Sequence, residues 1–203
     1  METRIARSIS YIFHPLLIPT YVTLILLNLP VFFSFMLTIT GKAIMTGLIF
    51  TMTFVFPFII VILMKRKNLI HSVFLESREE RVYPYLAIAM LYYATYFMMH
   101  QVHASQVFTF FMLGATFLAT CCLVINFFFM ISMHMTAVGA MLGFFLGLSL
   151  NLKTDFLWLI VSLLLITGLT GFARLKDSAH RPAEIYSGFI MGFTVMFLFF
   201  LLI

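Results

Sequence analysis

Residues 107–130 read VFTFFMLGATFLATCCLVINFFFM, a block of apolar side chains that contains no charged residue. A helix needs about 20 mostly apolar residues to cross about 30 Å of hydrocarbon, so this block is long enough to span a bilayer. Similar blocks recur along the chain, which is 63% hydrophobic and only 9% charged. An ordinary soluble domain carries roughly 25% charged residues. The sequence therefore predicts an integral membrane protein made of helices.

The apolar blocks set the number of helices. The predicted spans are residues 9–37, 43–64, 84–100, 107–130, 134–150, 156–172 and a last span that begins at Pro182. Pro84 suits the first turn of its span, whereas Pro15, Pro19 and Pro30 are expected to kink or break the first block. The predicted fold class is an all-α polytopic transmembrane bundle of six or seven helices. Residues 1–203 are predicted to form a single integral membrane domain, with a motif-bearing core at about residues 74–203.

Other classes of protein fit this sequence less well. A β-barrel would show short segments of alternating polarity, and the sequence has none. The net charge of +5 comes from basic residues beside the spans, which favours a membrane protein over a nucleic-acid-binding one. Two spans carry small residues at a spacing of four, which predicts close helix packing. These residues are Gly139, Gly143, Gly147, Gly188 and Gly192.

Polar residues gather in three clusters between the spans. The first cluster is residues 78–81, the second is residues 132–134 and the third is residues 174–184. Two predicted spans separate each cluster from the next, so all three are expected on the same face of the membrane. The topology is therefore compatible with one site that is assembled from all of them.

The third cluster has the residue types of a phosphate-transfer site. His180 and Glu184 are four residues apart at the start of the last helix and can therefore face each other. A carboxylate bonded to one imidazole nitrogen fixes the tautomer and makes the other nitrogen a better nucleophile. Arg174 precedes them, and its guanidinium group can bind two phosphate oxygens at once.

The second and first clusters add groups of related chemistry. Ser132 and His134 stand at the start of a helix, where free backbone N–H groups and the helix dipole favour anions. His134 could donate a proton to a leaving oxygen. Arg78 and Arg81 add two more guanidinium groups.

Structural roles are the alternative for these residues. Arginines that follow a span usually anchor its topology, and His180 with Glu184 could form a capping interaction. The remaining histidines are expected to be loop or interface residues: His14, His71, His100 and His103.

In order and spacing, the three clusters resemble the motifs of the type-2 phosphatidic acid phosphatase family, the membrane branch of the superfamily that includes the vanadium haloperoxidases. The family's third motif is Ser-Arg, five residues, His, three residues, Asp; here it reads Ala173-Arg174, five residues, His180, three residues, Glu184. The second, Pro-Ser-Gly-His, corresponds to Ile-Ser-Met-His at residues 131–134. The first, Lys, six residues, Arg-Pro, is reduced to residues 78–81 with Pro84 downstream. The resemblance covers the C-terminal two-thirds of the chain.

The resemblance implies a metal-independent phosphatase that hydrolyses a lipid phosphate or a polyprenyl diphosphate through a phospho-histidine. His180 would attack phosphorus, Glu184 would orient His180, and His134 would protonate the leaving oxygen. Four side chains would hold the phosphate oxygens, on which charge develops in the transition state: Arg174, Arg81, Arg78 and Ser132. Neither a metal nor another cofactor is expected.

Four departures from the family pattern leave a degenerate, non-catalytic member as an alternative. Met133 replaces a glycine whose backbone approaches the phosphate, and Ala173 replaces a serine ligand. The first motif's lysine is missing, and Glu184 replaces an aspartate, which lengthens the orienting side chain by one methylene. Lipid A dephosphorylation or phosphate transfer would use the same residues. A small transporter or a structural membrane protein would instead bind anionic head groups through basic loops, although the spans contain few of the mid-membrane polar residues expected of a transporter.

The side of the membrane on which the clusters lie is open, because two indications conflict. The other face carries two basic residues, Lys42 and Lys153, and the motif face carries the remaining ten: Arg4, Arg7, Lys65, Arg66, Lys67, Arg78, Arg81, Arg174, Lys176 and Arg181. The positive-inside rule then puts the clusters in the cytoplasm, whereas the family's usual arrangement puts them outside it. The expected location is a bacterial inner membrane, and the expected partners are the lipid bilayer and a phosphorylated lipid.

Overall fold

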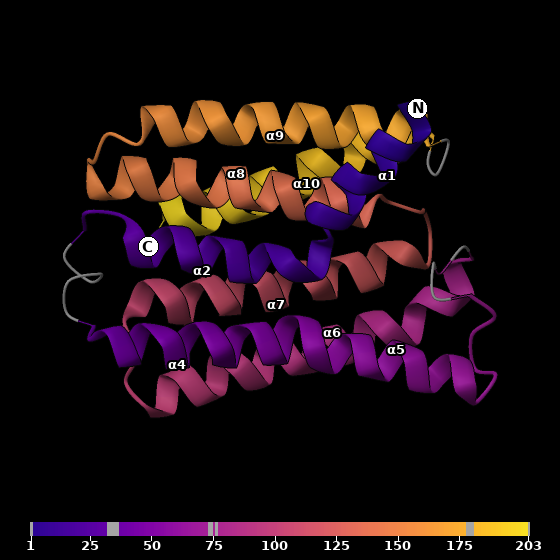
Figure 1. Ribbon diagram of the computed structural model, residues 1–203, viewed down its shortest axis with the longest axis horizontal. Helices are drawn as coiled ribbons and strands as arrows, with labels where there is room; N and C mark the ends of the chain where they lie inside the picture. The colour runs from indigo at the N-terminus through magenta and orange to yellow at the C-terminus, as the bar shows by residue number, and fades with distance from the viewer. Residues whose placement is uncertain (1, 32–36, 73–74, 76, 178–180, 203) are drawn as a thin grey trace. The chain divides into compact units, whose positions relative to one another are not determined.

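The computed structural model describes residues 2–31, 37–72, 75, 77–177 and 181–202, which form helices joined by short connections (Figure 1). These residues contain no β-strand, which confirms the predicted all-α class. Six of the described helices are long and apolar enough to cross a membrane: Ile5–Asn28, Ile39–Arg66, Gln106–Asn126, Met133–Leu152, Leu157–Lys176 and Pro182–Leu201. The chain divides into two compact units. Unit 1 is Met1–Ile18 with Phe129–Ile203, and unit 2 is Pro19–Phe128.

The long helices expose large apolar side chains, as a bilayer environment requires. In α9 (Leu157–Lys176), Trp158 is 83% exposed near the start of the helix and Leu165 is 65% exposed near its middle. Water would disfavour such extensive apolar surface, whereas lipid tails accept it. The chain is therefore an integral membrane protein.

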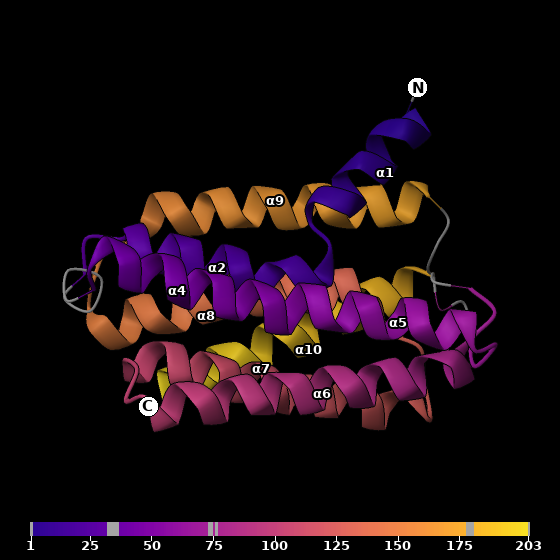
Figure 2. The ribbon, with the colours of Figure 1, turned by 60° about the horizontal axis from the view of Figure 1, so that its bottom comes forward.

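Unit 2 contains a long helix with a π-helical turn inside it and a pair of packed helices. The long helix consists of α4 (Ile39–Phe50) and α5 (Phe56–Arg66), and in the π-helical turn between them the Phe56 N–H donates to the Thr51 carbonyl oxygen. Pro57 follows at once, and because proline has no N–H to donate, the wider turn occurs where the regular ladder is already broken. The other two helices, α6 (Arg78–Gln101) and α7 (Gln106–Asn126), lie side by side (Figures 1 and 2).

The first apolar block breaks near Pro15 and before Pro30, as predicted, whereas Pro19 lies in the first turn of a helix and does not break it. The first helix, α1 (Glu2–Ile12), ends before Pro15, which opens a 3₁₀ turn, η1 (Pro15–Leu17). Next comes α2 (Ile18–Asn28), which ends two residues before Pro30. The helix α1 begins at Glu2, seven residues before the predicted start of the span at residue 9, so the polar residues before the apolar block are also helical.

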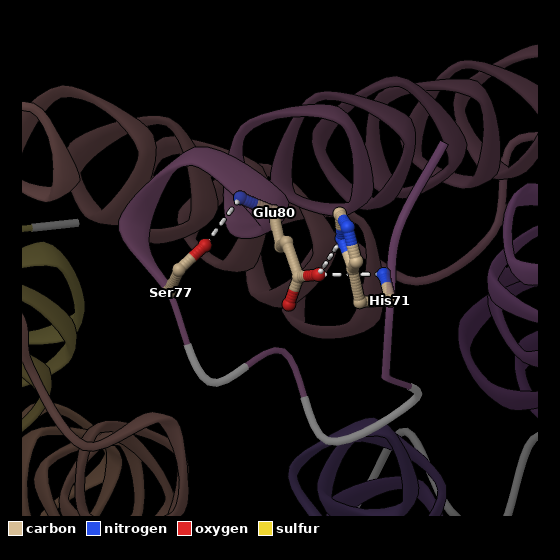
Figure 3. Close-up of polar contacts among 3 residues, drawn as sticks. All are labelled: His71, Ser77 and Glu80. Atoms are coloured by element: carbon tan, nitrogen blue, oxygen red, sulfur yellow. Dashed lines mark hydrogen bonds and ion pairs between the residues drawn. The ribbon is translucent and has the colours of Figure 1, made fainter. Parts of the chain in front are cut away.

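The start of α6 differs from the prediction that Pro84 lies in a first turn. The helix begins six residues earlier, at Arg78, because Ser77 caps it: the Ser77 hydroxyl accepts the Glu80 N–H at 3.3 Å. Pro84 therefore lies inside the helix. Figure 3 shows that the Glu80 carboxylate turns back to His71, accepting its backbone N–H at 2.6 Å and contacting its Nδ1 at 3.0 Å. This backbone hydrogen bond from His71 is the main reason that the pKa of Glu80 lies below its usual value.

Unit 1 is built around a close pair of parallel helices, α8 (Met133–Leu152) and α10 (Pro182–Leu201), with α9 running back between them in sequence (Figure 1). A Cβ added to Gly139 would lie 2.6 Å from the Phe189 carbonyl oxygen, and one added to Gly147 would lie 2.8 Å from that of Phe197. Contacts advance in the same direction along both helices, so α8 and α10 are parallel.

The predicted glycine packing is confirmed, and it fixes the register of the pair. On α10, a Cβ added to Gly188 would lie 2.8 Å from the Ser132 carbonyl oxygen, and one added to Gly192 would overlap the Thr136 carbonyl oxygen. Only residues without a side chain allow two backbones to approach this closely. The start of α8 is therefore held against the first turns of α10.

The ends of two spans differ from the sequence prediction by four residues. The helix α9 continues to Lys176 and not to Phe172, so Arg174 lies in its last turn, where a cation complements the helix dipole. The helix α7 ends at Asn126 and not at Met130. The Asn126 side chain donates to the Arg78 carbonyl oxygen at 2.8 Å, which ties the end of α7 to the start of α6.

Candidate functional site

The second polar cluster lies at the N-terminus of α8. Ser132 is the residue before the helix, in extended conformation, and it has 0% exposure. Its N–H donates to the Glu184 carbonyl oxygen at 3.0 Å, while its own carbonyl accepts the Thr136 N–H at 2.9 Å. Its Oγ is buried and has no hydrogen-bond partner within the described ranges of the chain. A buried hydroxyl thus stands at the positive end of a long helix, which is a favourable place for an anion.

His134 is the second residue of α8 and is half-buried. Its Nε2 lies 3.1 Å from the Ser10 carbonyl oxygen, and its ring meets the His14 ring edge to face, with centroids 5.7 Å apart. A carbonyl oxygen only accepts hydrogen bonds, so Nε2 carries the proton of this contact. In the neutral imidazole, Nδ1 is then the basic nitrogen.

Arg174 reaches the same place from the last turn of α9. Its guanidinium Nη1 donates to the Ser10 Oγ at 3.4 Å, and the side chain is half-buried. His134 and Arg174 therefore contact one residue, Ser10, through its backbone and its side chain. The structure brings together two residues that the sequence assigned to separate clusters.

The third cluster is only partly within the described residues. His180 lies outside them, so its predicted pairing with Glu184 stays a prediction. Glu184 lies in the first turn of α10, next to Pro182, and its side chain is half-buried. Its carbonyl, bonded to the Ser132 N–H, joins the second and third clusters directly.

The first cluster belongs to unit 2, and its arginines contact backbone carbonyls of that unit. Arg81 is only 7% exposed, and its Nε donates to the Leu75 carbonyl oxygen at 2.8 Å. Arg78 donates to the Phe128 carbonyl oxygen at 3.1 Å. These contacts hold the loop before α6 and the end of α7. The convergence of Arg78 and Arg81 with the other two clusters stays a prediction.

Two residues of the site were missed by the sequence analysis. Ser10 was not singled out, and His14 was expected to be a loop or interface residue, although it lies against His134. The Ser10–His134 contact joins residues 124 positions apart, and the Ser10–Arg174 contact joins residues 164 apart. No spacing along one helix links such residues, so only tertiary packing reveals them: that of α1 on α9 and that of the following turn, η1, on α8.

The described residues contain no group of three or more His, Cys, Asp or Glu side chains that could hold a metal ion. Compared with models of protein families, with curated proteins and with solved structures, the chain matches none.

Proposed function

We propose that the chain is a membrane phosphatase that hydrolyses a lipid phosphate or a polyprenyl diphosphate without a metal ion. The observation that supports this proposal best is the meeting of His134 and Arg174 at Ser10, beside the N-terminus of α8. In phosphoryl transfer, a cation and a helix N-terminus can stabilise the charge on the phosphate oxygens, and a histidine can transfer the proton of the leaving oxygen.

Binding of the anionic phosphate is assigned to positively charged side chains and to hydrogen-bond donors. The Arg174 guanidinium pairs with phosphate oxygens, and the α8 N-terminus together with the buried Ser132 hydroxyl adds hydrogen bonds. Arg78 and Arg81 are proposed as further cations for the same phosphate. Charged groups and hydrogen-bond donors of this kind stabilise the charge that develops on the phosphate oxygens in the transition state.

The proposed reaction has two steps. A ring nitrogen of His180 attacks phosphorus, the bond from phosphorus to the leaving oxygen breaks, and that oxygen takes a proton from the His134 imidazolium. Water then attacks the phospho-histidine and gives its proton to His134, while the bond from nitrogen to phosphorus breaks. Inorganic phosphate leaves, and both histidines return to their starting states. Glu184 is assigned the role of orienting His180.

The membrane setting favours an amphiphilic substrate. Unit 1's polar cluster lies at the ends of long apolar helices, so a lipid tail would lie in the bilayer while its phosphate reaches the start of α8. The same chemistry serves a lipid phosphomonoester, a polyprenyl diphosphate or lipid A. A bacterial inner membrane is the proposed location.

The test is phosphate release by the purified full chain in detergent with EDTA, from phosphatidic acid and from a polyprenyl diphosphate. We expect vanadate to inhibit the release. His134→Ala should lower kcat/KM by about 10²–10⁴-fold, the usual contribution of a general acid, and Arg174→Leu should lower it by about 10²–10³-fold. His100→Ala is the matched control, because His100 is exposed at the other end of α6, and it should retain full activity.

Equal activity of the wild-type, His134→Ala and Arg174→Leu proteins would refute the site. Binding of phosphatidic acid vesicles without any phosphate release would favour the alternative, a non-catalytic member that binds anionic head groups.

A further inference from the structure

The N-terminal helix α1 packs on α9 through a face of small residues. Ala6 and Ser10, one helical turn apart, are 2% and 8% exposed. The opposite face is exposed, with Ile5 at 58% and Ile12 at 55%. The small side chains bring the α1 backbone close to the last turns of α9, where Arg174 lies.

An ion pair fastens the same two helices at the aqueous end. Arg7 Nε lies 3.3 Å from Asp177 Oδ1, and Asp177 is the residue directly after α9. The Arg7 side chain is 67% exposed, so this exposed pair contributes about 0–1 kcal/mol at most.

Ser10 serves two candidate site residues at once. Its carbonyl oxygen accepts the His134 Nε2–H at 3.1 Å, and its hydroxyl accepts a hydrogen bond from Arg174 at 3.4 Å. The first contact selects the tautomer of His134, and the second orients the guanidinium group.

His14 holds the His134 ring from another side. The two rings meet edge to face at an interplanar angle of 79°. The His14 ring is itself fixed, because its Nδ1 accepts the Leu16 N–H at 3.3 Å in the turn that follows α1. The His134 ring therefore has both a hydrogen-bond partner and an aromatic neighbour on the segment 10–14.

We infer that α1 is a part of the phosphate site, and that Ser10 is a positioning residue that sets the tautomer of His134 and the orientation of Arg174. The expected effect of Ser10 on the reaction rate rests on the proposed function, whereas the expected tautomer of His134 does not. With Nε2–H bonded to Ser10, proton transfer to and from the substrate oxygen passes through Nδ1 of His134.

The kinetic test compares two serines of α1 in the full chain. Ser10→Ala removes the hydroxyl that Arg174 contacts and should lower kcat/KM by about fivefold, the effect of one lost hydrogen bond. Ser8→Ala is the matched control, because Ser8 is exposed on the same helix, and it should change kcat/KM by less than about twofold. Equal kinetics of the two variants would overturn the role of Ser10.

The structural test is the ¹⁵N NMR spectrum of histidine-labelled protein, in which the His134 signals are identified by their loss in His134→Gln. We expect Nε2 of His134 to carry the proton and Nδ1 to be unprotonated. Arg7→Glu should repel Asp177, loosen α1 and increase the other tautomer, and the charge swap Arg7→Asp with Asp177→Arg should restore the wild-type spectrum. A wild-type spectrum with Nδ1 protonated overturns the inference. If the protein shows the expected tautomer but releases no phosphate, the contact between Ser10 and His134 is supported and only the proposed function is overturned.

Discussion

Gly192 offers the sharpest test of the helix pair that holds the site. A Cβ at this position would overlap the Thr136 carbonyl oxygen, and even the next two atoms, Thr136 C and Ala140 N, would lie only 2.8 Å and 3.0 Å away. Ordinary contact begins at 3.4 Å. All three atoms are backbone atoms of α8, which cannot move aside by a change of rotamer. Gly192→Ala must therefore push α8 and α10 apart.

The expected cost is about 3 kcal/mol, the upper end of the range for overpacked cores. For a chain of this size, 1 kcal/mol changes the Tm by roughly 2–4 °C, so the Tm should fall by about 6–12 °C. The assay is thermal unfolding of the purified protein in detergent. Unfolding is monitored by tryptophan fluorescence or by the decrease of the monodisperse fraction of the protein with temperature.

Gly168→Ala is the matched control, because a Cβ at Gly168 in α9 would meet nothing within 4 Å. Its Tm should stay the same or rise by up to about 4 °C, since alanine favours a helix over glycine by about 0.5–1 kcal/mol. If the two variants melt at the same temperature, the close packing of α8 on α10 is wrong.

Two further predictions concern unit 2. The pKa of Glu80 is lowered mainly by the hydrogen bond from the His71 N–H. The ionised carboxylate therefore stabilises the connection before α6 at pH values above the ordinary carboxyl range. This stabilisation is lost as the pH falls below that range and the carboxylate is protonated. In the wild type, the protection factor of the His71 amide, measured by hydrogen exchange, should fall between about pH 7 and about pH 3. Glu80→Gln should remove that pH dependence. If Glu80→Gln and the wild type show the same pH profile, the contact between Glu80 and His71 is wrong. Asn126 is 2% exposed and donates to the Arg78 carbonyl, so Asn126→Ala should cost about 1 kcal/mol, seen as a Tm lower by roughly 2–4 °C. A Tm equal to that of the wild type would show that this hydrogen bond contributes nothing.

The positions of six of the seven predicted spans agree with the structure, because the bilayer imposes a length. The exception is the predicted span 84–100, whose helix, α6, is not among the described helices that are long and apolar enough to cross a membrane. Uncharged blocks of about 20 residues leave few alternatives to a membrane helix, and the prolines at 15 and 30 indicated where the first block breaks. The glycines at a spacing of four likewise predicted close packing on α8 and on α10, although only the structure shows that the two helices pack on each other. These features depend on composition and local spacing, which a sequence displays directly.

Helix ends were less predictable because single side chains set them. The hydroxyl of Ser77 starts α6 six residues before Pro84, and the amide of Asn126 ties down the end of α7. A serine or an asparagine near a span has many uses, and the sequence does not show which backbone group it will bind. The capping geometry decides the helix boundary, and it exists only in the folded chain.

The candidate site was predicted in part. Ser132, His134, Arg174 and the Glu184 backbone come together, as the order of the clusters suggested. The contribution of α1 could not be foreseen, because Ser10 meets His134 and Arg174 only through tertiary packing. Small residues on an N-terminal helix are the one signal in the sequence, and they also fit any close helix contact.

The most direct test of the proposed phosphatase is phosphate release by the wild-type chain and by His180→Ala, measured in EDTA with phosphatidic acid or a polyprenyl diphosphate, with His103→Ala as the control. The proposal predicts release by the wild type and by His103→Ala, and none by His180→Ala, which lacks the nucleophile. Release by His180→Ala at the wild-type rate would contradict it.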